Sequence, residues 1–189
     1  MPTRRVFIAQ SLSILAVPAI AQTSQTPATA SNAPNRVIRN ISGFRTHNWR
    51  DHFPTLDKVS ILCDTSSRSL HYWNPNGDFR LYATSVPQTD QLTRRGYTFV
   101  VRKRVAPDWT PTADMRERDP SLPAHMPPGP DNPLGTHAIY LGWTSYLIHG
   151  THDTRKIGRR SSSGCIGLYN EKIAELFEIT PVGAQVRII

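Results

Sequence analysis

The stretch of sequence that decides the fold is Tyr146-Leu-Ile-His149-Gly150-Thr-His-Asp-Thr-Arg-Lys-Ile-Gly-Arg-Arg-Ser-Ser-Ser163-Gly164-Cys165-Ile-Gly-Leu-Tyr-Asn170. The apolar run that ends at His149 predicts a short buried strand. The Ser-Ser-Gly turn before Cys165 predicts a flexible loop beside the same sheet. We therefore expect the two reactive side chains of this stretch, His149 and Cys165, to meet at one edge of a sheet.

A histidine beside a cysteine suggests acyl transfer. A thiol is a poor nucleophile until it ionises, and a neighbouring imidazole can take its proton to give a thiolate–imidazolium pair. Gly150 allows a sharp turn, and its main-chain carbonyl can orient the ring of His149. Gly164 leaves main-chain N–H groups near the Cys165 sulfur uncovered, which suits an oxyanion hole. The spacing alone fits two unrelated core residues equally well, so this interpretation needs further support.

Outside this stretch the sequence predicts a mainly β fold. Strands are predicted at 58–63, 69–73, 79–84, 97–105, 137–141, 146–149 and 184–189. The proline-rich segment 106–133 has no apolar period and predicts a long irregular loop. A helix is expected at 171–177, capped by Asn170, with Ile173, Leu176 and Phe177 on the face that covers the sheet. The pattern as a whole predicts a β-sandwich or barrel with one or two short helices.

The N-terminus has the pattern of an export signal. Arg4-Arg5 precede an apolar run and the small-residue pattern Ala19-Ile-Ala21, which predicts a signal peptide at residues 1–21. The apolar run is too short for a permanent span, so no stable membrane span is expected after cleavage. The arginine pair favours the twin-arginine route over the general secretory route. Residues 22–50, rich in small and polar residues, predict a flexible leader before a catalytic domain at 51–189.

The charge of the chain restricts its partners. Its 22 Lys and Arg against 14 Asp and Glu give a formal net charge of +8. Removal of residues 1–21 takes away two arginines and no acid, which leaves +6. A basic exported protein meets anionic polymers, and a substrate with free carboxylates fits this charge. Because the basic residues are scattered along the chain, nucleic acid is not expected as a partner.

The two cysteines are too few for a disulfide framework. Cys63 ends an apolar run and is predicted to fill the core, so we expect both thiols to be free. His149, His152 and Cys165 form an alternative ligand set for zinc, but a fourth ligand at the usual spacing is missing, and neither a metal nor a cofactor is expected. Four aromatic residues fit either a glycan-binding cleft or ordinary packing; they are Trp73, Trp109, Trp143 and Tyr146.

Several linked motifs in a fixed order add the support that the spacing lacks. They are Asp131-Asn-Pro-Leu-Gly135, Ala138-Ile-Tyr-Leu141, Ile148-His-Gly-Thr151, Ile157-Gly158 and Ser162-Ser-Gly-Cys-Ile166 followed by Leu168 and Asn170. Together they resemble the catalytic domain of the YkuD-type L,D-transpeptidases (ErfK/YbiS/YcfS/YnhG-like), over about residues 58–189. The resemblance implies a β-rich, sandwich-like fold with the nucleophile on a loop beside the sheet.

The resemblance also implies a function in cell-wall synthesis and cell shape. Cys165 would be the nucleophile and His149 the proton donor and acceptor, with Gly150, Ser163 and Gly164 in support. Cys165 would attack the carbonyl after the third residue of a peptidoglycan tetrapeptide stem and release D-alanine. A diaminopimelate amine of a second stem would then form a 3→3 cross-link, and a lysine of an outer-membrane lipoprotein or water are the other acceptors. The implied location is the periplasm or cell envelope.

Three positions depart from the pattern of the family. Ser163 stands where a second histidine is usual, Gly167 where arginine or asparagine is usual, and His137 where arginine is frequent. The change at Gly167 removes a cation that can hold a substrate carboxylate or a loop. Two alternatives to the transpeptidase therefore stay open. One is an exported, catalytically impaired peptidoglycan-binding relative, and the other is an L,D-carboxypeptidase that uses water as acceptor.

Overall fold

The computed structural model describes residues 45–189. The predicted signal peptide and most of the predicted leader lie outside the described residues. The end of the leader, residues 45–50, contacts the sheet: the His71 Nε2 atom lies 2.7 Å from the Arg45 carbonyl oxygen, and the His47 Nε2 atom lies 3.0 Å from a carboxylate oxygen of Asp64. Within residues 45–189, no helix has the length and apolar character needed to cross a membrane.

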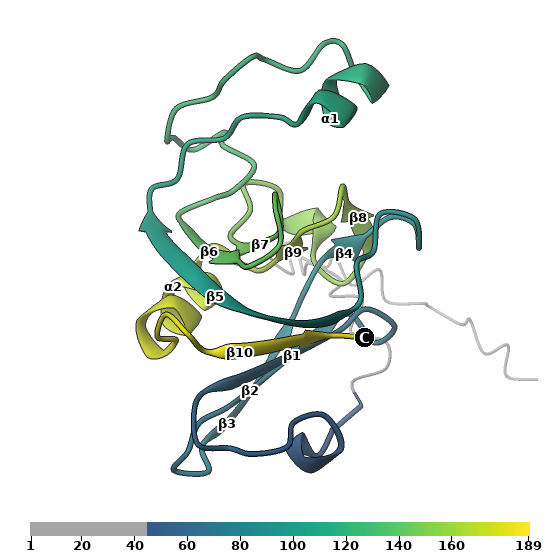
Figure 1. Cartoon of the computed structure of the whole chain (residues 1–189). Helices are drawn as coiled ribbons and strands as arrows, with labels where there is room; N and C mark the ends of the chain where they lie inside the picture. Colours follow the sequence, from purple (N-terminus) through teal and green to yellow (C-terminus); the bar gives the residue numbers. More distant parts are fainter. Residues whose placement is uncertain (1–44) are drawn as a thin grey trace, which may run out of the picture. The chain divides into compact units, whose positions relative to one another are not determined.

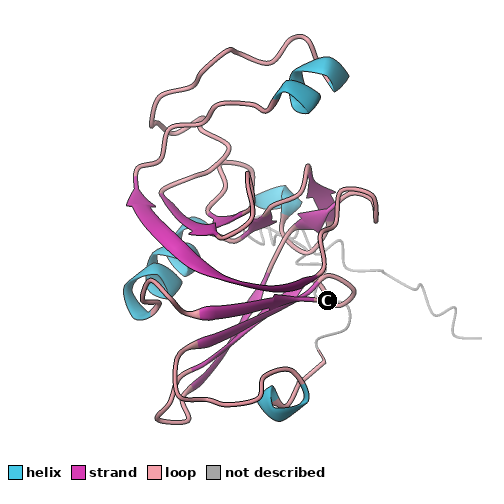
Figure 2. Ribbon diagram, viewed as in Figure 1, coloured by secondary structure: helices cyan, strands magenta, loops and turns pink. Residues whose placement is uncertain are grey.

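An eight-stranded sheet forms the body of residues 45–189 (Figures 1 and 2). Its strands, in spatial order, are β3 (Phe79–Ala83), β2 (Ser69–Trp73), β1 (Ser60–Asp64), β10 (Gln185–Ile188), β5 (Gly96–Val105), β6 (His137–Leu141), β7 (Leu147–His149) and β9 (Ile166–Gly167). The pairs β1–β10 and β7–β9 are parallel, and the others are antiparallel. A small parallel sheet pairs β4 (Val86–Pro87) with β8 (Arg160–Ser162). The prediction of a mainly β fold is confirmed.

The curled sheet encloses the main core on one face. Residues of β1 are buried at every position, as expected for a strand that is covered on both sides. Ile61 and Cys63 of this strand pack in the main core with residues of β6, β7 and β9. Leu62 points to the other face, where it packs with Phe53 and Trp73. Each fully buried aliphatic side chain contributes about 1.5–3 kcal/mol, so these two clusters fix the positions of the strands.

One α-helix packs against the sheet over β6. The helix α2 (Asn170–Ile179) buries Ile173 and Leu176, as its apolar period predicts. The prediction that Asn170 caps this helix is wrong, because Tyr169 occupies the N-cap and makes no side-chain cap bond. Asn170 is the first helical residue, and its side-chain oxygen instead accepts hydrogen bonds from two loop N–H groups described below.

The proline-rich segment 106–133 is not wholly irregular. It contains a short helix, α1 (Ala113–Arg118), capped by the Thr112 hydroxyl, which accepts a hydrogen bond of 3.2 Å from the Met115 N–H. Trp109 and Met126 exchange two backbone hydrogen bonds of 2.8 Å across the segment. No sequence pattern predicts α1, because none of its six residues is buried and no apolar period results. The 3-10 helices η1 (Trp49–Asp51) and η2 (Thr154–Lys156) complete the fold.

Candidate active site

The parallel pair β7–β9 brings His149 and Cys165 together. Its register sets Ile148 opposite Ile166 and His149 opposite Gly167. Cys165, immediately before β9, and Gly167, at its end, lie on the same face of the sheet, because side chains alternate along an extended chain. The His149 ring lies on that face, because its Cε1 atom is 3.9 Å from the place that a Cβ on Gly167 would take. The side chains of His149 and Cys165 both line one cavity of about 600 Å³.

A backbone carbonyl orients the His149 ring. Its Nδ1 atom lies 2.5 Å from the carbonyl oxygen of Gly150. Because a carbonyl can only accept, Nδ1 carries the proton, and the lone pair of Nε2 is left to act as a base. Burial lowers the pKa of His149 to about 4, with the charge of Lys156 acting in the same direction and the Gly150 hydrogen bond opposing it. The ring is therefore neutral near pH 7.

The Cys165 thiol is buried and protonated. Its Sγ atom donates a hydrogen bond of 3.4 Å to the Ser145 carbonyl oxygen. Burial raises the pKa of this thiol to about 11, against a hydrogen bond from the Leu147 backbone N–H. These pKa values favour a neutral thiol and a neutral imidazole. The thiolate–imidazolium pair stays a prediction for the substrate-bound state.

The sequence comparison agrees with this geometry. Residues 58–188 match the YkuD family, described as the L,D-transpeptidase catalytic domain. The chain belongs to this family. It is 57% identical over 188 residues, 98% of this chain and 97% of the relative, to a protein of Fuscovulum blasticum named as an L,D-transpeptidase in the ATP synthase subunits region. It is 41% identical over 142 residues to the Escherichia coli protein named as L,D-transpeptidase ErfK/SrfK, covering 72% of this chain but 46% of that protein.

Solved structures of L,D-transpeptidases share the fold. The structure from Mycobacterium smegmatis has a TM-score of 0.56 at 18% identity and covers 70% of this chain and 58% of that chain. The Enterococcus faecium L,D-transpeptidase also has a TM-score of 0.56 at 18% identity, covering 71% of this chain and 50% of its own. The curled eight-stranded sheet is thus the fold of the family.

Close packing accounts for Gly150. A Cβ at this position would lie 2.2 Å from the Asn170 side-chain oxygen. That oxygen accepts hydrogen bonds from the backbone N–H groups of Thr136 at 3.2 Å and Thr151 at 3.1 Å. The sharp turn expected at Gly150 is not the reason for the glycine, because its backbone is not left-handed. The glycine instead leaves room for Asn170, which fixes the chain immediately after His149.

Ser162 supports the nucleophile loop. Its hydroxyl donates a hydrogen bond of 2.6 Å to the Cys165 carbonyl oxygen and accepts a long one of 3.4 Å from the Gly164 N–H. Gly164 itself has φ +141°, a conformation that favours glycine. Ser163, which stands where the family usually has histidine, is exposed at the cavity wall. The sequence did not single out Ser162 among three consecutive serines, although a serine followed by a turn is a typical local hydrogen-bonding position.

A serine fills the space beside Gly167. Ser85 and Gly167 exchange two backbone hydrogen bonds, of 2.8 and 3.1 Å. A Cβ on Gly167 would lie 2.4 Å from the Ser85 hydroxyl oxygen. Ser85 is buried and lines the same cavity as Cys165. The larger side chain that the family usually carries at 167 would therefore displace Ser85, a residue that the sequence did not indicate.

Of the remaining candidate residues, some line the cavity and others pack against neighbouring side chains. Trp109 lines the cavity, whereas Trp73 packs on Phe53, and Trp143 packs edge-on against Tyr146. His137 is not at the cavity wall, and its ring lies against Phe177 with a centroid distance of 4.9 Å. Within residues 45–189, no three His, Cys, Asp or Glu side chains are arranged to hold a metal ion. His149, His152 and Cys165, the alternative zinc set, are thus not brought together as such a group.

Proposed function

We propose that this protein is an exported peptidoglycan L,D-transpeptidase with Cys165 as nucleophile and His149 as proton acceptor and donor. One observation carries the proposal: Cys165 shares a cavity with a histidine whose Nδ1–H is held by the Gly150 carbonyl, so that Nε2 is the free base. Membership of the family supports the reaction class. No cofactor is needed for a cysteine acyl transfer.

The reaction has two halves. The Cys165 Sγ atom attacks the carbonyl carbon after the third residue of a tetrapeptide stem while its proton passes to His149 Nε2. The carbon–nitrogen bond to D-alanine then breaks, the departing amine takes that proton, and a thioester remains. In the second half an acceptor amine attacks the thioester, His149 takes a proton from the amine, and the proton returns to the released sulfur.

The proposed location is compatible with three acceptors. In the periplasm or cell envelope, a diaminopimelate amine of a second stem gives the 3→3 cross-link. A lysine of an outer-membrane lipoprotein or water would use the same thioester. We propose the stem peptides as the main partner, and export by a signal peptide at residues 1–21, through the twin-arginine route, as the means by which the enzyme reaches them.

A second candidate function is supported by two observations. Gly167 offers no side chain to a substrate, and burial, which raises the pKa of Cys165 to about 11, leaves little thiolate. An exported peptidoglycan-binding relative with impaired turnover would have these properties. The two functions differ in whether Cys165 forms a covalent product.

Mass spectrometry of purified muropeptides tests the proposal. The protein without residues 1–21 is incubated with tetrapeptide-bearing muropeptides, and we expect loss of D-alanine and formation of 3→3 dimers. The Cys165→Ala variant should give neither product. Cys63→Ala is the matched control, because it removes the other thiol and should keep both products. His149→Gln should lower the rate by roughly 10²–10⁴-fold.

Each other result has a clear meaning. Loss of D-alanine without dimers, dependent on Cys165, would identify a carboxypeptidase that uses water, or an acceptor protein absent from the assay. Absence of any Cys165-dependent product would reject the transpeptidase and support the impaired binding relative.

A further inference from the structure

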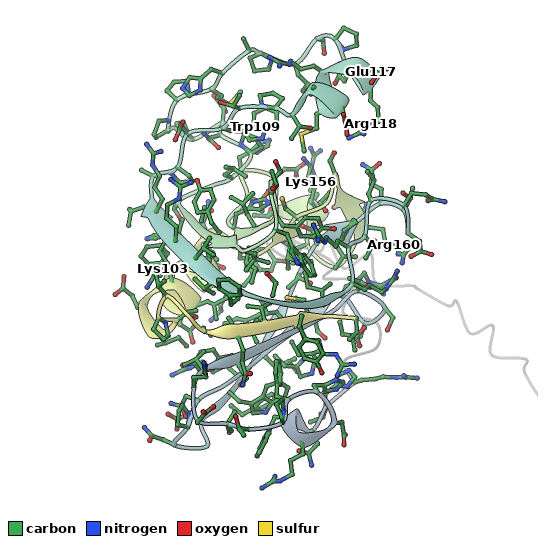
Figure 3. All side chains as sticks on the ribbon, in the orientation of Figure 1. Lys103, Trp109, Glu117, Arg118, Lys156 and Arg160 are labelled. Atoms are coloured by element: carbon green, nitrogen blue, oxygen red, sulfur yellow. The ribbon has the colours of Figure 1, made fainter. Side chains whose placement is uncertain are left out.

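Two cations that have no ionic partner among residues 45–189 line the cavity that holds the nucleophile. Arg118 comes from α1 and Lys156 from η2, and both line the same cavity as Cys165 and His149. Figure 3 shows Arg118 beside α1 and Lys156 on the side of the strands that faces it. Among residues 45–189, neither side-chain cation lies within 4.0 Å of a carboxylate oxygen.

Two cations near Lys156 do have carboxylate partners. Arg155, next to Lys156, donates to Asp153 at 2.8 Å. Arg160 of β8 lies 3.2 Å from Asp90. The charges of Arg118 and Lys156 are therefore available to a ligand.

The cavity also holds two carboxylates, Asp119 and Asp131, which must be weighed against the cations. One oxygen of Asp119 accepts hydrogen bonds of 3.1 Å and 2.6 Å from the backbone and hydroxyl of Ser121. Neither acid forms an ion pair with Lys156 or Arg118. The cavity therefore carries both acidic and basic side chains, and its two acids do not neutralise its two cations by direct contact.

Lys156 is fixed close to the reacting groups. Its side chain is half-buried, and its carbonyl oxygen accepts hydrogen bonds from the Ser161 hydroxyl at 3.2 Å and the Arg159 N–H at 3.1 Å. Its charge reaches His149, where it adds to the effect of burial in lowering the pKa of the ring. A carboxylate bound to Lys156 would therefore lie near the histidine that serves Cys165.

The chemistry of the proposed donor supplies such a carboxylate. The residue that leaves is a terminal D-alanine, whose free carboxylate is separated from the attacked carbonyl by a single residue. One residue spans at most about 3.6 Å of extended chain. A cation that recognises this carboxylate must therefore line the cavity of the nucleophile itself.

We propose that Lys156, together with Arg118 from the opposite wall, binds the terminal carboxylate of the acyl donor and sets the preference for stems that end in a free carboxylate. The inference rests on the proposed function. Gly167, whose Cβ position is closed by Ser85, leaves this task to residues outside the β9 strand. A lysine ammonium on a flexible stem and an arginine fork are both suited to a carboxylate.

Steady-state kinetics of D-alanine release test this subsite. Lys156→Gln and Arg118→Gln should each raise KM for the tetrapeptide roughly tenfold, as expected for loss of a charge-assisted hydrogen bond. With a stem that ends in D-alaninamide, which loses both contacts at once, wild type should show a KM raised by at least about tenfold, and neither variant should raise it further. Lys156→Arg keeps the charge and should restore most of the affinity. Arg116→Gln on α1 and Lys58→Gln are charge-matched controls away from the cavity and should behave as wild type.

A binding measurement separates this inference from the proposed function. Calorimetry of the tetrapeptide with Cys165→Ala needs no turnover, and Lys156→Gln in that background should weaken Kd roughly tenfold. If wild type turns over but Lys156→Gln and Arg118→Gln leave KM unchanged, the inference is wrong and the function stands. If wild type gives no product while the charge variants still weaken binding, the proposed function is wrong and the carboxylate subsite stands. If Lys156→Gln and Arg118→Gln raise KM by the same factor with the amidated stem as with the free acid, the carboxylate is not the group that these residues recognise.

Discussion

At the scale of single residues, the protonation state of Cys165 decides whether the Cys165–His149 pair is neutral or ionic before a substrate binds. Its pKa of about 11 and the pKa of about 4 for His149 describe a neutral pair that exchanges a proton during attack. In many thiol enzymes the pair is ionic before substrate binds. The difference has a direct readout in the reactivity of the thiol.

We expect the rate of alkylation of Cys165 by iodoacetamide to rise about tenfold per pH unit from pH 7 to pH 9, because only the thiolate reacts. The rate is followed by intact-protein mass spectrometry. Cys165→Ala is the control and should stay unmodified, since Cys63 is buried and burial raises its pKa well above the usual value. A rate that is already constant below pH 8 would mean that the ion pair exists in the free protein.

The sequence predicted that His149 and Cys165 meet, and the structure places both on one cavity, but the sequence did not predict their surroundings. The spacing of the pair fitted two unrelated core residues equally well, so the linked motifs around it were needed to name these residues. Ser85 acts on Gly167 from 82 positions away, and no local pattern carries such a contact. The consecutive serines 161–163 have the same residue type, so only the hydrogen bond of Ser162 to the Cys165 carbonyl distinguishes them.

At the scale of elements, Asn170 joins α2 to the loops beside the active site. Its oxygen accepts hydrogen bonds from the N–H groups of Thr136, just before β6, and Thr151, just after β7. The same oxygen would lie 2.2 Å from a Cβ on Gly135 or on Gly150. One amide thus connects three elements and sets the chain direction after His149.

Asn170→Ala should lower the free energy of unfolding by about 2 kcal/mol, because two backbone donors lose their partner. Urea denaturation followed by circular dichroism measures the change. Asn170→Asp keeps an acceptor oxygen and should recover part of the loss. Glu171→Ala, on the next residue of the same helix, serves as control and should stay within about 0.5 kcal/mol of wild type. Equal stability of the alanine variant at 170 and wild type would contradict this role.

The elements could be predicted to different degrees for physical reasons. Strands such as β1 and β2 bury apolar side chains, so burial leaves a pattern in the sequence. The helix α2 has a clear apolar face, and its extent was predicted within a few residues. The helix α1 buries nothing, and its presence depends on the Thr112 cap and on the Trp109–Met126 pairing. The strands β4, β8 and β9, which the sequence did not predict, are too short to show a period.

At the scale of the described domain, buried histidines link stability to pH. Burial is the largest cause that lowers the pKa of His52, His71 and His149 below 6.5. A histidine with a lowered folded pKa disfavours the proton in the native state, so the unfolded state takes up more protons as the pH falls. The free energy of unfolding should therefore decline below about pH 6.5, until His149 itself is protonated near pH 4.

Urea denaturation at pH 7 and pH 5 measures this dependence. His149 alone should lower the free energy of unfolding by about 2 kcal/mol over that interval. His149→Gln should reduce the difference between the two pH values, whereas the exposed His125→Gln should not. Asp64, although buried, has its pKa lowered by hydrogen bonds from Ser66, Ser67 and His47 and titrates below this window. Equal stability at pH 7 and pH 5 would show that the histidines are not neutral in the folded protein.

The burial of the Cys165 thiol, which donates a hydrogen bond to the Ser145 carbonyl, has a consequence for its oxidation if the protein is exported as proposed above. Oxidants convert a cysteine to sulfenic acid by way of the thiolate. With a pKa of about 11, roughly one molecule in 10⁴ carries a thiolate at pH 7. Both cysteines of the described residues are free and buried. An idle enzyme of this kind keeps its nucleophile reduced without a dedicated reductase, and exposes it to damage only while a substrate is being processed.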